Sequence, residues 1–155
     1  MSVFVEYIGV KIRTMHAHSR AEDGMDYKYK PKDYNSLSPY LVVNRANELM
    51  ALLIQLFNGK ELRRYGVPDG SIMHAEVLID DSVIMVADAL EHSPPLTQLL
   101  HVYVPDVDQT YEKAIQLGCE SVQTPIEIPG DPDKRGAFKD FAGNIWYIST
   151  TMRQE

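Results

Sequence analysis

The order of secondary-structure signals occurs twice along this chain of 155 residues, and that repeat limits the folds it can adopt. The first copy has a strand, a helix and three strands at residues 39–43, 44–57, 61–66, 72–79 and 82–87. The second copy has the same five elements at residues 99–104, 106–117, 120–127, 135–140 and 144–150. The sequence therefore predicts two β-α-β-β-β modules.

Local signals set the predicted limits of the modules. Asn44 is the predicted cap of the first helix, and Gly59 and Gly118 follow the ends of the two helices. The modules span about residues 36–92 and 96–151 of a domain over residues 36–155. Residues 1–35 are interpreted as an N-terminal extension, with a strand-like part at 3–15 that adds to a sheet edge or reaches a partner chain, followed by a polar loop.

Composition excludes several classes of protein. Hydrophobic residues make up 45% of the chain, as in ordinary globular domains, and no apolar stretch is long enough for a membrane span. The net charge of −7 argues against a nucleic-acid partner. The only cysteine, Cys119, cannot form a disulfide within the chain and is expected to be a small buried apolar residue. With no export signal at the start, we expect a cytoplasmic location.

Alternation along the strands predicts which side chains face away from the helices. Met73, Ala75 and Val77 are expected to pack on a helix, while His74 and Glu76 point the other way. If the modules pack side by side, a cupped sheet would present one common cavity lined by Tyr40, His74, Glu76, Met85, His101, Tyr103, Tyr147 and Ser149.

Four phrases of the sequence point to a known superfamily. They are Ser38-Pro39-Tyr40-Leu41, Pro68-Asp69-Gly70 with His74-Ala75-Glu76, Tyr103-Val104-Pro105-Asp106-Val107-Asp108, and Arg135-Gly136-Ala137 through Asp140 to Gly143-Asn144-Ile145-Trp146. With the doubled module, they resemble the vicinal oxygen chelate superfamily of glyoxalase I, bleomycin-resistance proteins, fosfomycin-resistance enzymes and extradiol dioxygenases, in the branch named after the phosphonate-operon B protein. The resemblance implies an α+β, glyoxalase-like fold, in which two modules form a cupped mixed sheet.

The resemblance also implies where a metal would lie. Superfamily enzymes hold a divalent ion with His or Glu on the first, fourth, fifth and eighth strands, and the matching positions here are Ser38, Met85, Leu99 and Tyr147. None of these is a good ligand for a hard divalent ion, although a shift of two residues on the fifth strand would bring in His101. We therefore expect no metal at that site and no cofactor.

An alternative site uses other residues. His74 and Glu76 share a strand face, and His101 from the second module could complete an open three-ligand site for one divalent metal ion. The chain would then be a metal-dependent lyase, isomerase or transferase with Glu76 as ligand or general base. In the other interpretation, His74 and Glu76 form a hydrogen-bonded pair that lines a wet cavity.

The poor ligands at the superfamily positions favour a binding protein over an enzyme. We predict a homodimer that sequesters an aromatic or cationic small molecule, as bleomycin-resistance proteins do without a catalytic metal. Arg135 would meet any anionic group of that ligand. The predicted ligand contacts are Tyr40, Met85, Tyr103, Arg135, Trp146 and Tyr147. Whether the chain is also catalytic stays open at this point.

Overall fold

The computed structural model describes residues 29–153, so the strand predicted at residues 3–15 lies outside the described part. In chain order, the first module consists of β1 (Tyr40–Val43), α1 (Ala46–Phe57), β2 (Lys60–Gly66), β3 (Ile72–Ile79) and β4 (Ser82–Asp88). The second consists of β5 (Leu99–Tyr103), α2 (Val107–Gln116), β6 (Glu120–Glu127), β7 (Asp133–Lys139) and β8 (Ile145–Thr151). The predicted repeat is confirmed, with boundaries within two residues of those expected.

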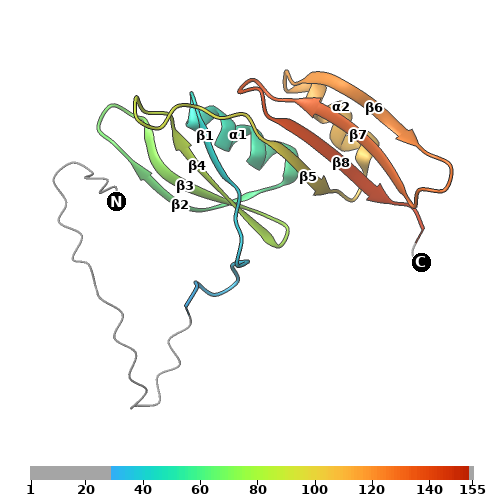
Figure 1. Cartoon of the computed structure of the whole chain (residues 1–155), viewed down its shortest axis with the longest axis horizontal. Coiled ribbons are helices and arrows are strands. Elements are labelled where there is room, and N and C mark those ends of the chain that lie inside the picture. The colour runs from blue at the N-terminus through green and yellow to red at the C-terminus, as the bar shows by residue number, and fades with distance from the viewer. Residues whose placement is uncertain (1–28, 154–155) are drawn as a thin grey trace, which may run out of the picture.

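Each module forms its own four-stranded mixed sheet, and the two modules lie side by side along the longest axis of the molecule (Figure 1). The strand orders are β1-β4-β3-β2 and β5-β8-β7-β6. The first strand of each module pairs in parallel with the last, and the other neighbours are antiparallel. The fold is therefore α+β, with the same topology in both halves.

The core lies between each sheet and its helix. Leu41, Val77 and Val86 are fully buried on the helix side of the first sheet, and α1 buries Ala46, Leu49, Met50, Leu52, Leu53 and Leu56 against it. In the second module, Phe138, Trp146 and Ile148 join the same continuous apolar cluster. These are the faces that alternation predicts.

The prediction that Met73 packs on a helix is wrong. Its side chain is 51% exposed, while Ile72 is buried. Tyr65 pairs with His74 but Gly66 pairs with Ile72, so Met73 is the extra residue of a β-bulge. A bulge shifts the alternation of side chains by one residue, which sequence spacing alone does not reveal.

The predicted cap of the first helix is also wrong. Arg45, in a left-handed conformation, occupies the cap position of α1 and makes no capping hydrogen bond with its side chain. Instead, the Asp88 carboxylate at the end of β4 accepts hydrogen bonds from the backbone N–H groups of Ala46 (2.9 Å) and Ile72 (2.7 Å). A carboxylate from another strand thus satisfies the free donor of the helix.

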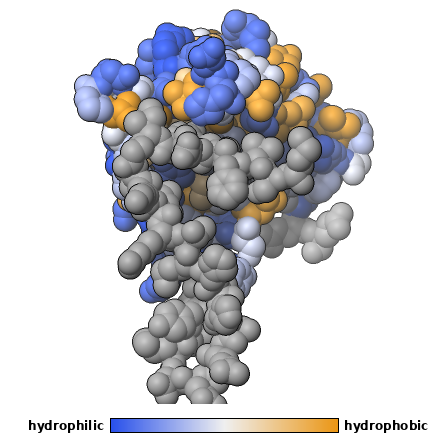
Figure 2. Space-filling view, turned by 60° about the vertical axis from the view of Figure 1, so that its left-hand side comes forward, coloured by the Kyte–Doolittle hydropathy of each residue, from blue (hydrophilic) through white to orange (hydrophobic). Residues whose placement is uncertain are grey.

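The modules meet mainly through their helices. The α1 and α2 helices are in contact, and the rings of Phe57 and Trp146 lie 5.5 Å apart between their centres. At the edge of this contact, the Arg45 guanidinium lies 4.4 Å from the ring centre of Phe141. Among residues 29–153, no helix has the length and apolar character that crossing a membrane requires. Figure 2 brings the first module forward and shows hydrophobic residues interspersed among hydrophilic ones on its surface.

Candidate functional site

The open face of the first sheet carries a row of polar and polarisable side chains. Across the strands, Tyr40 pairs with Met85, Met85 with Glu76, and Glu76 with Arg63. His74 is two residues before Glu76 on β3 and therefore lies on the same face. The predicted grouping of Tyr40, His74, Glu76 and Met85 on one face thus agrees with the strand register.

Glu76 is the buried centre of this face, with 3% of its surface exposed. His74 Nε2 lies 3.1 Å from Oε1, while the Tyr34 hydroxyl donates to Oε2 and Arg63 Nε lies 3.5 Å from the same oxygen. Burial acts to raise the pKa of Glu76, but the bonds from Tyr34 and His74 and the charge of Arg63 outweigh it and lower the pKa. The carboxylate is therefore ionised at neutral pH.

His74 links this carboxylate to an exposed phenol. The Tyr40 hydroxyl lies 3.1 Å from His74 Nδ1, and the two ring centres are 5.7 Å apart. The ring of Tyr65, on β2, stands on the other side with its centre 6.2 Å from that of His74. Because an ionised carboxylate can only accept, the proton of a neutral His74 is on Nε2 and Tyr40 donates to Nδ1.

The open face of the second sheet is arranged around a different carboxylate. The Tyr103 hydroxyl donates to Asp133 Oδ2 (3.0 Å), and the Thr151 hydroxyl donates to Asp133 Oδ1 (2.9 Å). The bond to Asp133 raises the pKa of Tyr103, because a negative charge disfavours the phenolate. His101 Nε2 lies 3.0 Å from Ser149 Oγ, and the His101 and Tyr103 rings meet edge to face at 4.8 Å.

Arg135 is drawn toward acidic residues on this second face. Its Nη2 donates to Asp131 Oδ1 (2.9 Å) and lies 3.6 Å from Asp133 Oδ2, while its buried Nε has no hydrogen-bond partner. Two carboxylates therefore surround one guanidinium. The net charge of these three side chains is therefore negative.

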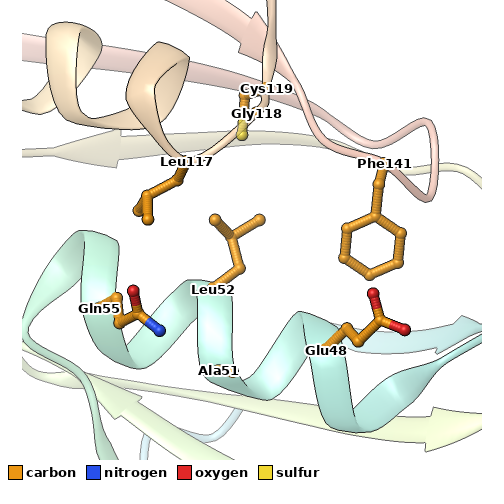
Figure 3. Close-up of a pocket in the computed structure, with 8 residues that line it drawn as sticks. All are labelled: Glu48, Ala51, Leu52, Gln55, Leu117, Gly118, Cys119 and Phe141. Carbon is orange, nitrogen blue, oxygen red and sulfur yellow. The ribbon is translucent and has the colours of Figure 1, made fainter.

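Two cavities in the structure lie outside the predicted common cavity, the first away from both open faces and the second beside the second open face, at Asp131 and Asp133. The first, of about 220 Å³, lies between α1 and α2 (Figure 3), and its lining is Glu48, Ala51, Leu52, Gln55, Leu117, Gly118, Cys119 and Phe141. The second, of about 390 Å³, is lined by residues 127–133, Met152 and Arg153. None of the residues predicted to share a common cavity lines either one, so that prediction stays unconfirmed.

Comparison with known proteins shows which solved structures share this fold. No protein-family model matches the chain. The protein Rv0887c from Mycobacterium tuberculosis, which is uncharacterized, is 28% identical over 155 residues, covering 92% of this chain and 87% of the relative. Among solved structures, TioX from Micromonospora sp. ML1 superposes with a TM-score of 0.62 at 19% identity and covers 78% of this chain and 99% of its own.

Two further solved structures agree with TioX. The PhnB protein from Bacillus cereus has a TM-score of 0.60 at 17% identity, covering 75% of this chain and 99% of its own. TnmS3, an antibiotic-binding protein from Streptomyces sp. CB03234, has a TM-score of 0.57 at 16% identity, covering 72% and 91%. The chain has the fold of the vicinal oxygen chelate superfamily.

The residues at the metal positions of the vicinal oxygen chelate fold do not suit a divalent ion. In the structure, Met85 pairs with Tyr40, and Tyr147 pairs with His101, whereas Leu99 pairs with Ile145. The register therefore places His101 beside Tyr147, which is the shifted alignment considered for the fifth strand. Ser38, at the first-strand position, lies two residues before β1. With His101 in place of Leu99, the set is an aliphatic hydroxyl, a thioether, an imidazole and one phenol, which is a poor donor set for a hard cation.

The alternative metal site is not assembled within the described chain either. His74 and Glu76 lie on β3 of the first sheet, and His101 lies on β5 of the second. Among residues 29–153, no group of three or more His, Cys, Asp or Glu side chains converges as metal ligands would. Both oxygens of Glu76 already accept hydrogen bonds, so the structure agrees with the hydrogen-bonded pair instead.

Trp146 was predicted as a ligand contact, and the structure contradicts this. The side chain is fully buried on the helix side of β8, and its Nε1 donates to Asp140 Oδ2 (2.9 Å). Trp146 is therefore a core residue, because its neighbours Ile145 and Tyr147 occupy the open face. Cys119 is buried as expected, and burial raises the pKa of its thiol to about 11.

Sequence reasoning missed three residues that build the two faces. Tyr34 donates a hydrogen bond to Glu76, Arg63 forms an ion pair with it, and Asp133 accepts the hydrogen bond from Tyr103. The sequence predicts Tyr34 in a polar loop outside the domain. In the structure, Tyr34 donates to Glu76 on the first sheet, and the neighbouring Asn35 donates to the Asp81 carbonyl. Alternation along β2 would have placed Arg63 on the face of Tyr65, but no sequence signal pairs Tyr34 with Glu76.

Proposed function

We propose that the protein binds a small organic molecule with an aromatic or cationic group on the open faces of its sheets, and needs no metal ion to do so. The observation that carries this proposal is that two tyrosines have exposed rings but hydrogen-bonded hydroxyl groups. Tyr40 and Tyr103 are 44% and 62% exposed, yet their hydroxyls are held 3.1 Å from His74 Nδ1 and 3.0 Å from Asp133 Oδ2. Rings fixed in this way lose little conformational freedom when a ligand stacks on them.

The two open faces differ in charge, so each suits a different kind of ligand group. On the second face, Asp131 and Asp133 outnumber Arg135, which favours a cation over the ring of Tyr103. On the first face, Arg63 balances Glu76, so the surroundings of Tyr40 suit a neutral aromatic ring. Met85 and Tyr147 extend these surfaces with a flexible thioether and a further ring.

The fold supports this proposal, because TnmS3, which shares it, is an antibiotic-binding protein. We further propose that the chain acts as a homodimer. The open faces leave Tyr40, Tyr65, Leu99 and Tyr103 in contact with water, and β2 and β6 are edge strands with pairing groups on one side. A second copy would cover such surfaces.

A thermal-shift series on chelator-treated protein tests the binding proposal. The panel holds aromatic cations, neutral aromatic compounds and aliphatic amines, so that ring and charge are varied separately. We expect aromatic cations to raise the melting temperature, since a ligand at a hundredfold its Kd adds about 2.7 kcal/mol of stability. Tyr103→Ala should remove most of that rise, while Tyr111→Phe, at a half-buried position of α2 that packs against the core, should keep it.

The same series separates binding from metal-dependent activity. If the panel has no effect until a divalent metal is added, the metal-free proposal is wrong. Elemental analysis of untreated protein then decides whether one ion per chain is present. Sedimentation equilibrium in parallel would contradict the homodimer if it gave a mass near 17.6 kDa, the mass of one chain.

A further inference from the structure

We propose that Glu76, His74 and Tyr40 form a hydrogen-bonded triad that activates the Tyr40 oxygen as a nucleophile toward ligands with an electrophilic acyl or sulfonyl centre. The three side chains run in one line from a buried carboxylate to an exposed phenol, across β3 and β1 of the first sheet. This activity goes beyond the binding function proposed above, which requires no such chemistry.

The carboxylate end of the triad is fixed in both position and charge. Glu76 Oε1 faces His74 Nε2 at 3.1 Å, and Oε2 accepts from the Tyr34 hydroxyl beside Arg63 Nε at 3.5 Å. With both oxygens engaged and 3% of its surface exposed, Glu76 cannot turn away from the imidazole. It therefore orients the His74 ring, as the carboxylate of a Ser-His-Asp triad orients its histidine.

The imidazole then acts as the base. Because Glu76 only accepts, His74 Nε2 carries the proton and the Nδ1 lone pair points at the Tyr40 hydroxyl, 3.1 Å away. When Tyr40 reacts, its proton passes to Nδ1 and the imidazolium that forms lies against an ionised carboxylate. The charge created in the step is thus stabilised by a group already in place.

The other described tyrosines lack this arrangement. Tyr34 and Tyr103 donate to the carboxylates of Glu76 and Asp133, and the pKa of both phenols is raised. Tyr29 and Tyr111 pair with the hydroxyls of Ser36 and Ser121. Tyr65 approaches His74 through its ring, at 6.2 Å between centres, and Tyr147 has no hydrogen bond to an imidazole within residues 29–153, so the tyrosine with such a bond there is Tyr40. Its exposure lets a ligand reach the oxygen from the open face.

A sulfonyl fluoride gives a reaction that can be followed at a single residue. The probe is phenylmethanesulfonyl fluoride, which combines the electrophile with a neutral aromatic ring, the kind of group that the surroundings of Tyr40 suit. The Tyr40 oxygen attacks sulfur, the S–O bond forms, and the S–F bond breaks with loss of fluoride. The phenol proton goes to His74 Nδ1 and from there to water. The product is a sulfonyl ester of Tyr40.

The full chain is treated with a small excess of probe at pH 7.5, and tyrosine labelling is measured over time by peptide mass spectrometry. We expect Tyr40 to be labelled at least about tenfold faster than Tyr65 and Tyr103, which serve as exposed internal controls in the same digest. His74→Gln should lower the Tyr40 rate by about tenfold or more, and Glu76→Gln should lower it less. Tyr111→Phe should leave it unchanged.

Each outcome either supports the triad or overturns it. Equal labelling of the exposed tyrosines, or a Tyr40 rate that His74→Gln does not change, overturns it. If a His74 variant unfolds, the internal comparison within the wild-type digest decides. The corresponding sulfonamide, which lacks the leaving group, reports binding alone. Binding of the sulfonamide without selective labelling would therefore disprove the triad and leave the proposed binding function standing.

Discussion

The two modules share one topology but hold an exposed tyrosine in different chemical states. Tyr40 on β1 donates to a histidine that a buried glutamate orients, whereas Tyr103 on β5 donates to the Asp133 carboxylate. The first arrangement makes the phenol a better nucleophile, and the second raises its pKa. The comparison shows that a repeated backbone constrains the core face, while the open face is free to diverge.

The two helices also differ, both in how many residues they bury and in how their N-termini are capped. The α1 helix buries Ala46, Leu49, Met50, Leu52, Leu53 and Leu56, whereas α2 buries Val107 and Ala114. The Asp88 carboxylate of β4 caps α1, and Asp106, next to its own helix, caps α2 by accepting from the Gln109 N–H (2.9 Å). The N-terminus of the first helix is thus capped by a distant residue, and that of the second by a neighbouring one.

The largest expected difference between the modules lies in their last hairpin turns. Asp140→Ala removes a buried carboxylate that accepts from the backbone N–H groups of Ala142 and Asn144, from Asn144 Nδ2 and from Trp146 Nε1. We expect the free energy of unfolding in urea to fall by about 3–5 kcal/mol, because buried donors lose their acceptor.

The matched control is the corresponding turn of the first module. Asp81 is exposed there, between β3 and β4. We therefore expect Asp81→Ala to change the free energy of unfolding by less than about 0.5 kcal/mol. Similar losses in the two variants would show that the turns do not differ as the structure indicates.

The helix caps give a second, smaller contrast. Asp88→Ala leaves the N–H groups of Ala46 and Ile72 without their acceptor, and we expect a loss of about 1–2 kcal/mol. Asp106→Ala removes one local cap and should cost about 1 kcal/mol. Urea denaturation followed by circular dichroism measures both losses. A larger loss in Asp106→Ala than in Asp88→Ala would contradict the greater contribution expected of the long-range cap.

Acid sensitivity gives the third and smallest contrast. The pKa of Glu76 is lower in the folded chain than its usual value of 4.5, so ionised Glu76 stabilises the fold above about that pH. The contribution is lost as the pH falls through the folded pKa. Asp133 behaves likewise from its usual value of 3.8, because bonds from Thr151 and Tyr103 lower its pKa against the effect of burial.

We therefore expect Glu76→Gln to flatten the fall in unfolding free energy between about pH 5 and 3. Asp133→Asn should flatten it only at the lower end of this range. Unfolding in urea at a series of pH values measures both effects, with Glu112→Gln on the exposed side of α2 as the control. A Glu76→Gln curve parallel to that of the wild type would contradict the role given to this carboxylate.

Much of the fold was predictable, and less of the site. Helical spacing and strand alternation predicted every described element within two residues, because hydrophobic periodicity is a local property. They failed at Met73, where a bulge breaks the alternation, and at Asn44, whose expected capping role Asp88 takes. They also failed at Trp146, since an aromatic residue near a predicted cavity can equally belong to the core.

The sequence by itself determined the doubled module, the faces of most strands, and the placement of His74 and Glu76 together. Only the tertiary structure decided which partners those side chains meet. The bonds of Tyr34 with Glu76, Tyr40 with His74, and Tyr103 with Asp133 join residues that are 42, 34 and 30 positions apart. Such pairs form only when strand register and loop path bring donor and acceptor within hydrogen-bond distance, and local propensity does not encode that distance.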